Sequence, residues 1–183
     1  MAYGVMIESR IQATNIDALN RTAQATVDVA GGGLISLAES GTQGNDVWTA
    51  TAPASETVGD LWMAYNPAEH LTVVNGKMFA GLSADPRDYT NIANRPFDCF
   101  KPQVGDEVDV TIDCVDATSS SAVVGDILES KAGQTTLTRI AKNTGATAGH
   151  TAFVIENVGV EPFPQAGIGM ANVTMFRCKC IQA

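Results

Sequence analysis

The chain has 183 residues, with 20 acidic against 11 basic side chains and a formal net charge of −9. This length suits one domain, or one domain with an arm, that buries roughly 70% of its unfolded surface and needs neither a disulfide nor a metal ion to hold its core. The acidic balance argues against a nucleic-acid partner, because phosphates require clustered Lys and Arg, and it suits a protein partner with a neutral or basic surface.

The N-terminus carries no recognisable export signal. Residues 1–6 lack a basic stretch followed by an apolar one, and Glu8 and Arg10 follow too soon for a signal peptide. No apolar run reaches the roughly 20 residues that cross a bilayer. We therefore expect synthesis in a reducing cytoplasm without export, no membrane partner, and free thiols at the four cysteines, which are Cys99, Cys114, Cys178 and Cys180.

Residues 1–30 are expected to form an extended N-terminal arm that ends in a first strand. They are rich in Ala, Thr, Asn and Gln, and their large apolar residues do not keep one long period. Such a segment cannot form its own core, so its order should come from packing on a neighbour or on residues 31–183, which we expect to be a single β domain. Removing an arm of this kind should leave a folded body.

The glycine run Gly31–Gly33 separates two strand-like segments, residues 25–29 and 34–37, and this pattern predicts a β-hairpin. A phosphate-binding loop would need a helix and usually a Lys after the glycines, and neither follows. Further along the chain, short strands are expected at residues 47–51 and 61–65.

Two short helical turns are expected between strands. Asn66-Pro67-Ala68-Glu69 has a capping residue, then Pro, then Glu, which is typical of a helix start. Asp85-Pro86-Arg87-Asp88-Tyr89 opens in a similar way. Both segments are short, so we interpret them as connectors.

The clearest strand is expected at Glu107–Cys114, where apolar and polar residues alternate. Its buried face would hold Val108, Val110, Ile112 and Cys114, and its solvated face Glu107, Asp109, Thr111 and Asp113. One buried face and one solvated face are typical of an antiparallel strand.

Further strands are expected at residues 122–128, 135–140, 152–158 and 173–181. Strands without long helical patterns between them predict a mainly β protein, an antiparallel sandwich or barrel with short helical turns.

The tripeptide Val-Gly-Asp occurs three times, at residues 58–60, 104–106 and 124–126. Each Gly-Asp can make a turn that leads into a strand. The spacings are unequal, so we interpret the recurrence as reused turn chemistry and not as a repeat architecture.

The sequence offers no recognisable catalytic apparatus. Only His70 and His150 could serve as imidazole bases, and no Gly-x-Ser-x-Gly elbow is present. Both are interpreted as surface or capping histidines. Gly167–Asn172 begins like a dinucleotide-binding fingerprint, but Asn172 stands where the third Gly or Ala belongs, and the strand and helix of that motif are lacking. We expect a non-enzymatic protein without a cofactor; a hydrolase without a recognisable motif is a lesser alternative.

Two groups of residues could in principle hold a metal ion. Cys178 and Cys180 lie on one face of a strand, but a zinc site usually needs wider spacing and a second pair, so buried thiols are the favoured interpretation. The second group is a set of acids accompanied by a single base, Lys101, without a calcium-loop motif. We interpret it as a charged, exposed face, while a bound cation or a pair of catalytic carboxylates stays open. Its members are Asp98, Asp106, Glu107, Asp109, Asp113, Asp116, Asp126 and Glu129.

The segments Phe100–Val108 and Val124–Leu128, in a body rich in Gly, Ala, Thr and Val, resemble turns of the small β-barrel head decoration proteins of tailed bacteriophages. The resemblance is one of style and covers roughly the C-terminal half. It implies a non-enzymatic virion protein, a capsid decoration or cement protein that stabilises contacts between major capsid subunits. It also implies a symmetric oligomer on the capsid surface, with the major capsid protein and copies of itself as partners. It assigns no site residues.

A ligand-binding β-sandwich of the carbohydrate-recognition type is the main alternative. Trp48, Trp62 and Tyr65 would form its stacking platform. Trp62 and Tyr65 have opposite parity in one expected strand, so they cannot both face the same way. Core packing of at least one of them is therefore favoured.

Overall fold

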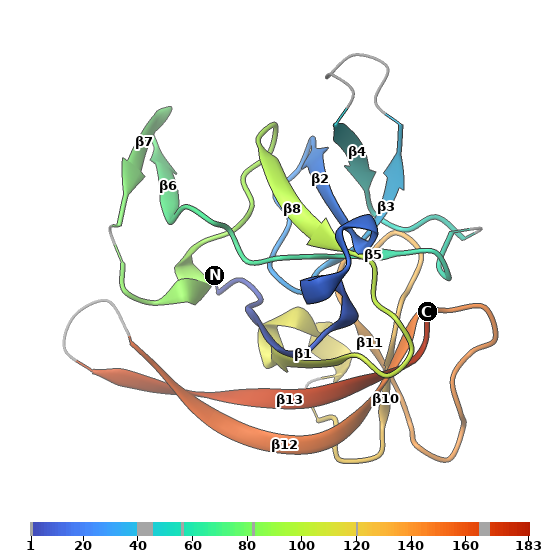
Figure 1. Cartoon of the computed structure of the whole chain (residues 1–183). Helices are drawn as coiled ribbons and strands as arrows, with labels where there is room; N and C mark the ends of the chain where they lie inside the picture. The colour runs from blue at the N-terminus through green and yellow to red at the C-terminus, as the bar shows by residue number, and fades with distance from the viewer. Residues whose placement is uncertain (1, 40–45, 56, 82, 120, 165–168) are drawn as a thin grey trace.

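A computed structural model describes the chain apart from residues 1, 40–45, 56, 82, 120 and 165–168 (Figure 1). The protein is mainly β, as the sequence predicted. Its strands form a six-stranded sheet, a closed five-stranded barrel and a separate two-stranded hairpin, and they are joined by short 3-10 turns.

The barrel closes in the order β2-β4-β3-β5-β8. Its strands are β2 (Asn20–Ala25), β3 (Leu34–Ala38), β4 (Val47–Thr51), β5 (Trp62–Ala64) and β8 (Pro96–Phe100). Neighbours are antiparallel except β2 and β4, which are parallel. Small side chains fill much of its interior, which holds Ala23, Ala25, Val29, Ile35, Ala50, Ala64, Phe97 and Cys99.

The six-stranded sheet is antiparallel throughout and has the order β1-β9-β13-β12-β10-β11. Its strands are β1 (Met6–Arg10), β9 (Glu107–Thr111), β10 (Ile127–Glu129), β11 (Thr138–Ile140), β12 (Ala152–Pro164) and β13 (Met170–Gln182). The main core contains residues of both sheets, with Leu34, Met63 and Phe100 from the barrel and Val110, Phe153 and Phe176 from the sheet.

Residues 2–30 belong to the body. Strand β1 pairs with β9, and β2 lies in the barrel between β4 and β8. Val5, Met6 and Ile11 are buried. This segment was expected to be ordered by packing either on a neighbouring molecule or on residues 31–183. In the structure it packs on residues 31–183. Because deletion would remove a barrel strand and an edge strand, the structure argues against the expectation that the rest of the chain stays folded without this segment.

The hairpin predicted around Gly31–Gly33 is also wrong, since β4 lies between β2 and β3. Instead, the glycine backbone passes close to the segment that holds Ala64 and Asn66. Gly32, at φ +75°, donates its N–H to the carbonyl of Ala64 at 2.8 Å. A Cβ on Gly31 would lie 2.0 Å from Oδ1 of Asn66. Glycine is needed here because other chain segments approach the backbone too closely for a side chain.

The strand predicted at Glu107–Cys114 is confirmed as far as Thr111, where the 3-10 turn η4 (Ile112–Cys114) begins. Val108 and Val110 are buried as expected. Thr111 is fully buried against the expectation, because its Oγ1 accepts the N–H of Val5 at 3.0 Å. This contact ties the start of the chain to the end of β9.

Other expected elements shift in length or differ. The segments at 122–128 and 135–140 shrink to β10 and β11, and those at 152–158 and 173–181 lengthen into β12 and β13. Residues 66–69 form a bend without a helical turn. The turn after Asp85 is confirmed as η3 (Pro86–Asp88), and the short strand at 47–51 is confirmed as β4.

One hairpin was not foreseen, β6 (Leu71–Val74) with β7 (Lys77–Ala80). Its turn residues Asn75 and Gly76 have φ of 51° and 73°. Asn-Gly is a strong signal for a two-residue hairpin turn, so the sequence did carry a usable signal for this element.

Two Val-Gly-Asp turns, at 104–106 and 124–126, dock on the two long strands in the same way. The glycine N–H of the first donates to the carbonyl of Cys180 on β13 at 2.9 Å, and that of the second to Ile155 on β12 at 2.8 Å. The same strand residues donate their N–H back to the aspartate carbonyls at 2.8 and 2.9 Å. The interpretation as reused turn chemistry is confirmed for these two copies.

Each of these turns is held by its own buried aspartate. The carboxylate of Asp126 accepts the N–H of Val123 at 3.0 Å and of Lys142 at 3.1 Å, and Nε of Arg139 at 2.6 Å. Burial alone would raise the pKa of Asp126, but these hydrogen bonds outweigh burial and lower it. Asp106 is buried too and accepts two backbone N–H groups.

We expect Val110→Asp to lower the free energy of unfolding by about 4 kcal/mol or more, because it places a carboxylate in the core. Asp109→Ala should leave stability nearly unchanged, since Asp109 pairs with the exposed Arg177 at the surface. Urea unfolding followed by circular dichroism measures both. The reverse order of effects would mean that the register of β9 is wrong by one residue.

Asp126→Ala should cost about 3 kcal/mol or more, because it leaves buried N–H groups without an acceptor. The matched control is Asp60→Ala in the remaining Val-Gly-Asp, at residues 58–60. The side chain of Asp60 is 75% exposed and, among the described residues, forms an ion pair only with Lys101, so we expect a loss below about 1 kcal/mol. Since the folded protein lowers the pKa of Asp126, its contribution should be lost as the pH falls below the ordinary value of 3.8. Equal losses in both variants, measured by urea unfolding, would contradict the assigned roles.

Candidate functional site

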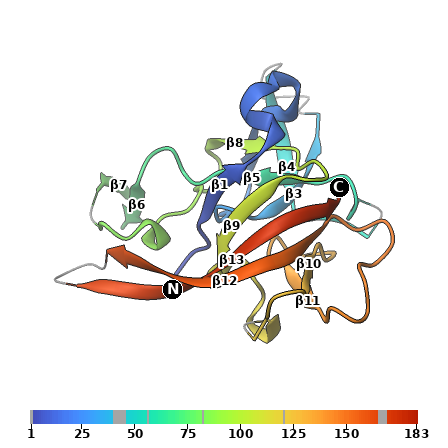
Figure 2. The ribbon, with the colours of Figure 1, turned by 60° about the horizontal axis from the view of Figure 1, so that its bottom comes forward.

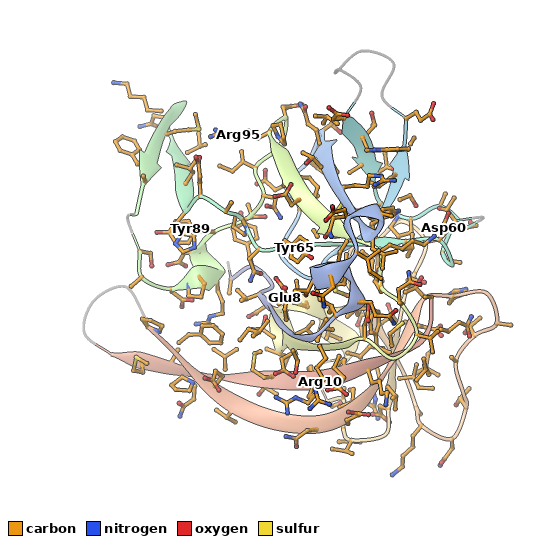
Figure 3. The ribbon with its side chains drawn as sticks, viewed as in Figure 1. Glu8, Arg10, Asp60, Tyr65, Tyr89 and Arg95 are labelled. Atoms are coloured by element: carbon orange, nitrogen blue, oxygen red, sulfur yellow. The ribbon has the colours of Figure 1, made fainter. Side chains whose placement is uncertain are left out.

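A groove of about 1180 Å³ lies between the barrel and the β6–β7 hairpin. Its lining comes from β1, β2, the ends of β4 and β8, and the segments around residues 65–71 and 90–95. Figure 3 shows Tyr65 near its middle, with Glu8 on one side and Arg95 on the other. Because these elements are far apart in sequence, only the folded chain brings the groove residues together.

Trp48 contributes one wall of the groove, whereas Trp62 does not line it. The guanidinium of Arg21 lies over both indoles, 5.7 Å from the ring centroid of Trp48 and 5.6 Å from that of Trp62. This arrangement is a cation–π contact that also orders the arginine. It occupies one face of the Trp48 ring.

Tyr65 lines the groove but is anchored in the body. Its ring packs against Phe100 with centroids 5.0 Å apart, and its hydroxyl donates to Oδ1 of Asn20 at 3.1 Å. Burial raises the pKa of Tyr65 to about 12, and the negative charges of Glu8 and Asp98 add to this effect. The carboxylates of Glu8 and Asp98 thus place negative charge close to the groove floor.

The lining of the groove has four carboxylates, on Glu8, Asp46, Glu69 and Asp98, against two guanidiniums, on Arg21 and Arg95. Arg95 is engaged by Glu69 at 3.7 Å. Within the described part of the chain, Glu8, Asp46 and Asp98 have no ion-pair partner. The groove therefore favours a cationic ligand.

A second feature is the free end of the ribbon formed by β12 and β13. Strand β9 pairs with β13 only over Met175–Lys179, and β10 pairs with β12 only over Ala152–Val154. Within the described residues, the rest of the ribbon has no third strand on either edge, and it projects from the body (Figure 2). The register places Val158, Val160 and Met170 on one face, and all three are exposed.

The other face of the ribbon packs on the N-terminal residues. Phe163, Val173 and Met175 form a small core with Val5. The guanidinium of Arg87 lies 5.8 Å from the centroid of the Phe163 ring. One face of the ribbon is thus fixed, and the other is free to meet a partner.

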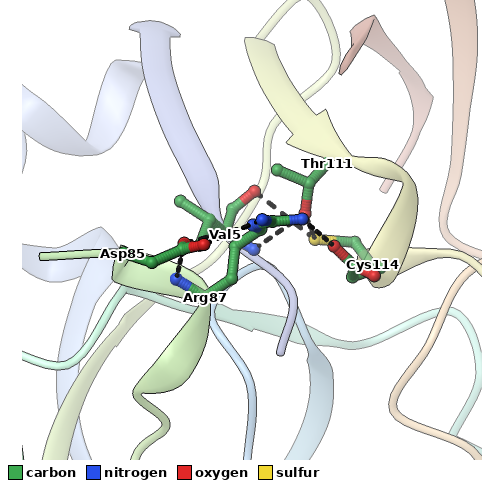
Figure 4. A network of polar contacts seen from close by, with 6 residues as sticks. Val5, Asp85, Arg87, Thr111 and Cys114 are labelled. Atoms are coloured by element: carbon green, nitrogen blue, oxygen red, sulfur yellow. Dashed lines mark hydrogen bonds and ion pairs between the residues drawn. The ribbon is translucent and has the colours of Figure 1, made fainter. Parts of the chain in front are cut away.

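Arg87 also connects two carboxylates, and Figure 4 shows its contact with Asp85. Its Nη2 lies 2.8 Å from Oδ2 of Asp85, and its Nη1 lies 3.8 Å from Oδ2 of Asp113. The second distance is an ion pair but too long for a hydrogen bond, and that buried Asp113 oxygen has no hydrogen-bond partner among the described residues.

The two carboxylates respond to this site in opposite directions. Burial tends to raise the pKa of Asp85, but the hydrogen bonds and charge of Arg87 prevail and lower it. Burial raises the pKa of Asp113, and Arg87 opposes this only in part. Ionised Asp85 therefore stabilises the fold, whereas ionised Asp113 costs stability.

The two histidines lie in different settings. His70 is exposed, and its ring stacks on Tyr89 with centroids 4.4 Å apart. Nδ1 of His150 lies 2.9 Å from the carbonyl oxygen of Ser130. These contacts agree with the interpretation of both as surface or capping residues. In the fingerprint-like Gly167–Asn172, residues 167 and 168 lie outside the described residues, and Met170 to Asn172 belong to β13.

All four cysteines are free, as predicted, and all four are buried. Burial raises the pKa of Cys99, Cys114 and Cys180 to about 12, so each is a neutral thiol at physiological pH. They behave as small core residues. Among the described residues, no group of three or more His, Cys, Asp or Glu side chains is placed to hold a metal ion.

The expected exposed acidic face exists only in part. Asp106, Asp126 and Glu129 are buried. Glu129 accepts the N–H and the hydroxyl of Thr147 at 2.9 and 2.8 Å. These carboxylates are buried because they supply acceptors that turn and loop backbone would otherwise lack.

We expect Asp85→Asn to lower the free energy of unfolding by about 1–3 kcal/mol at pH 7, because Arg87 loses its charged partner. Asp113→Asn should leave it unchanged or raise it, since the variant removes an ionised group whose pKa is raised in the fold. That gain should vanish in acid, as Asp113 becomes protonated in the wild type. Thermal unfolding across pH measures both, and a larger loss from Asp113→Asn would contradict the assignment.

No protein-family model matches this sequence. No curated protein and no solved structure is similar to it at a significant level. Within the described residues, no helix has the length and apolar character that crossing a bilayer requires.

Proposed function

We propose that the protein is a non-enzymatic virion structural protein, a capsid decoration or cement protein that stabilises contacts between major capsid subunits. The observation that carries the proposal is the free β12–β13 ribbon with its exposed Val158, Val160 and Met170. The capsid as its location rests on the resemblance of the Val-Gly-Asp turns to those of phage decoration proteins.

A free ribbon of this kind is poorly suited to standing alone in water. A two-stranded ribbon is marginally stable by itself, and its unpaired edges offer N–H and C=O groups to other chains. Exposed apolar residues on one face add an area that gains free energy when it is covered. A second copy or a capsid subunit could supply both the cover and the added strand.

The β6–β7 hairpin supplies a second projecting element with similar chemistry. Val73, Met78 and Phe79 are exposed on it. In both views it extends toward the same side of the body as the ribbon tip (Figures 1 and 2). Two projections on one side suit a protein that bridges neighbouring subunits of a lattice.

A carbohydrate-recognition module is the second candidate. Trp48 and Tyr65 do line one groove, together with carboxylate and amide side chains that suit sugar hydroxyls. However, Arg21 occupies one face of Trp48, and Phe100 packs against Tyr65. These contacts cover part of each ring and so reduce the surface that is open for stacking on a sugar.

We expect Val160→Asp to weaken self-association or attachment to capsids at least tenfold, because it buries a charge in the proposed contact. Val104→Asp is the matched control, since both valines are 62% exposed and Val104 lies in a turn of the body. Sedimentation velocity, native mass spectrometry and negative-stain imaging with capsids give the readouts. Equal behaviour of both variants, or a wild type that neither self-associates nor attaches, would overturn the proposal.

A further inference from the structure

We infer that the groove beside Tyr65 binds an extended peptide segment that carries Lys or Arg side chains and belongs to a partner protein. This goes beyond the proposed function, because it concerns a different surface and holds whether or not the ribbon contacts a capsid. The partner is specified by its chemistry, a basic extended chain.

Charge complementarity is the first reason. The four groove carboxylates outnumber the two guanidiniums, and both guanidiniums are already engaged. Arg95 lies 3.7 Å from Glu69, and Arg21 lies over the indoles of Trp48 and Trp62. Glu8 and Asp98 thus remain without a cation among the described residues. A ligand with positive side chains would satisfy them and would also suit the net charge of −9.

The unpaired edge of β6 is the second reason. Among the described residues, strand β6 pairs only with β7 in a two-stranded sheet, and Leu71 at its start lines the groove. In Figure 1, β6 lies between β7 and β8, so its free edge faces the barrel. An extended peptide can add to such an edge as a third strand, with alternate side chains directed to the two sides.

The size and lining of the groove favour a peptide over a small cation or a sugar. At about 1180 Å³, it exceeds the roughly 300–1,000 Å³ of most small-molecule pockets. The aromatic rings that a sugar would stack on are partly covered by Arg21 and Phe100, as described above. Their remaining surface can still contact the methylene chain of a Lys or Arg.

The test uses a hexapeptide of alternating Lys and Val, blocked at both ends and labelled with a neutral dye. Fluorescence anisotropy at low salt should show binding to the full chain, with no binding of the alternating Glu and Val peptide. The double variant Glu8→Gln, Asp98→Asn should bind the basic peptide about fivefold more weakly. The Asn side chain keeps an oxygen acceptor for the hydroxyl of Thr22, which lies 3.0 Å from Asp98.

The matched control is the double variant Asp17→Asn, Glu161→Gln, which removes the same charge from two exposed positions outside the groove. It should bind the peptide like the wild type. Hydrogen exchange should show added protection of the β6 amides, residues 71–74, when the basic peptide is present. Thermal unfolding verifies that both double variants are folded.

Three results would overturn the inference. They are no binding of the basic peptide, equal weakening in both double variants, and protection at the ribbon instead of at β6. Binding of chitohexaose or maltohexaose that Trp48→Ala abolishes, without peptide binding, would assign the groove to sugars instead. Val160→Asp should bind the peptide like the wild type, so failure of the capsid proposal and failure of this one are distinguishable.

Discussion

The fold depends on two buried carboxylates, those of Asp106 and Asp126, which close the turns on either side of the long ribbon. Each accepts backbone N–H groups that no strand partner could satisfy. Each of these turns also exchanges two backbone hydrogen bonds with one ribbon strand. The Asp106 turn bonds to Cys180, and the Asp126 turn bonds to Ile155. The base of the ribbon is thus held on both edges by a Val-Gly-Asp turn.

Because the two turns hold the ribbon at its base, its far end can extend away from the body. Strands β9 and β10 follow directly after the two turns and pair with β13 and β12 only near the base. Further out, one face is held by Val5 and by the Arg87–Phe163 contact, while the other face keeps its apolar residues exposed. The ribbon is therefore supported at its base and on one face, and its other face is free.

The molecule therefore presents two surfaces of different chemistry. The ribbon face is apolar and edged by unpaired backbone, which suits contacts between copies or with a lattice. The groove is acidic and bordered by the free edge of β6, which suits a basic extended chain. In the interior, burial keeps the cysteine thiols neutral, and hydrogen bonds keep the buried carboxylate of Asp126 ionised.

The sequence by itself determined the class of fold and its local chemistry. Alternation at Glu107–Thr111 identified a half-buried strand, and the repeated Val-Gly-Asp identified turns that start strands, because both depend on neighbours within a few residues. Asn75-Gly76 carried the same kind of local signal for the β6–β7 hairpin.

Only the tertiary structure decided how the strands pair. Contacts between distant segments place β4 between β2 and β3 and bring Glu8 and Asp98 to one groove. Such contacts also bring Asn66 so close to Gly31 that no side chain fits there. No local pattern encodes such contacts, because their free energy comes from packing that exists only once both sheets have formed.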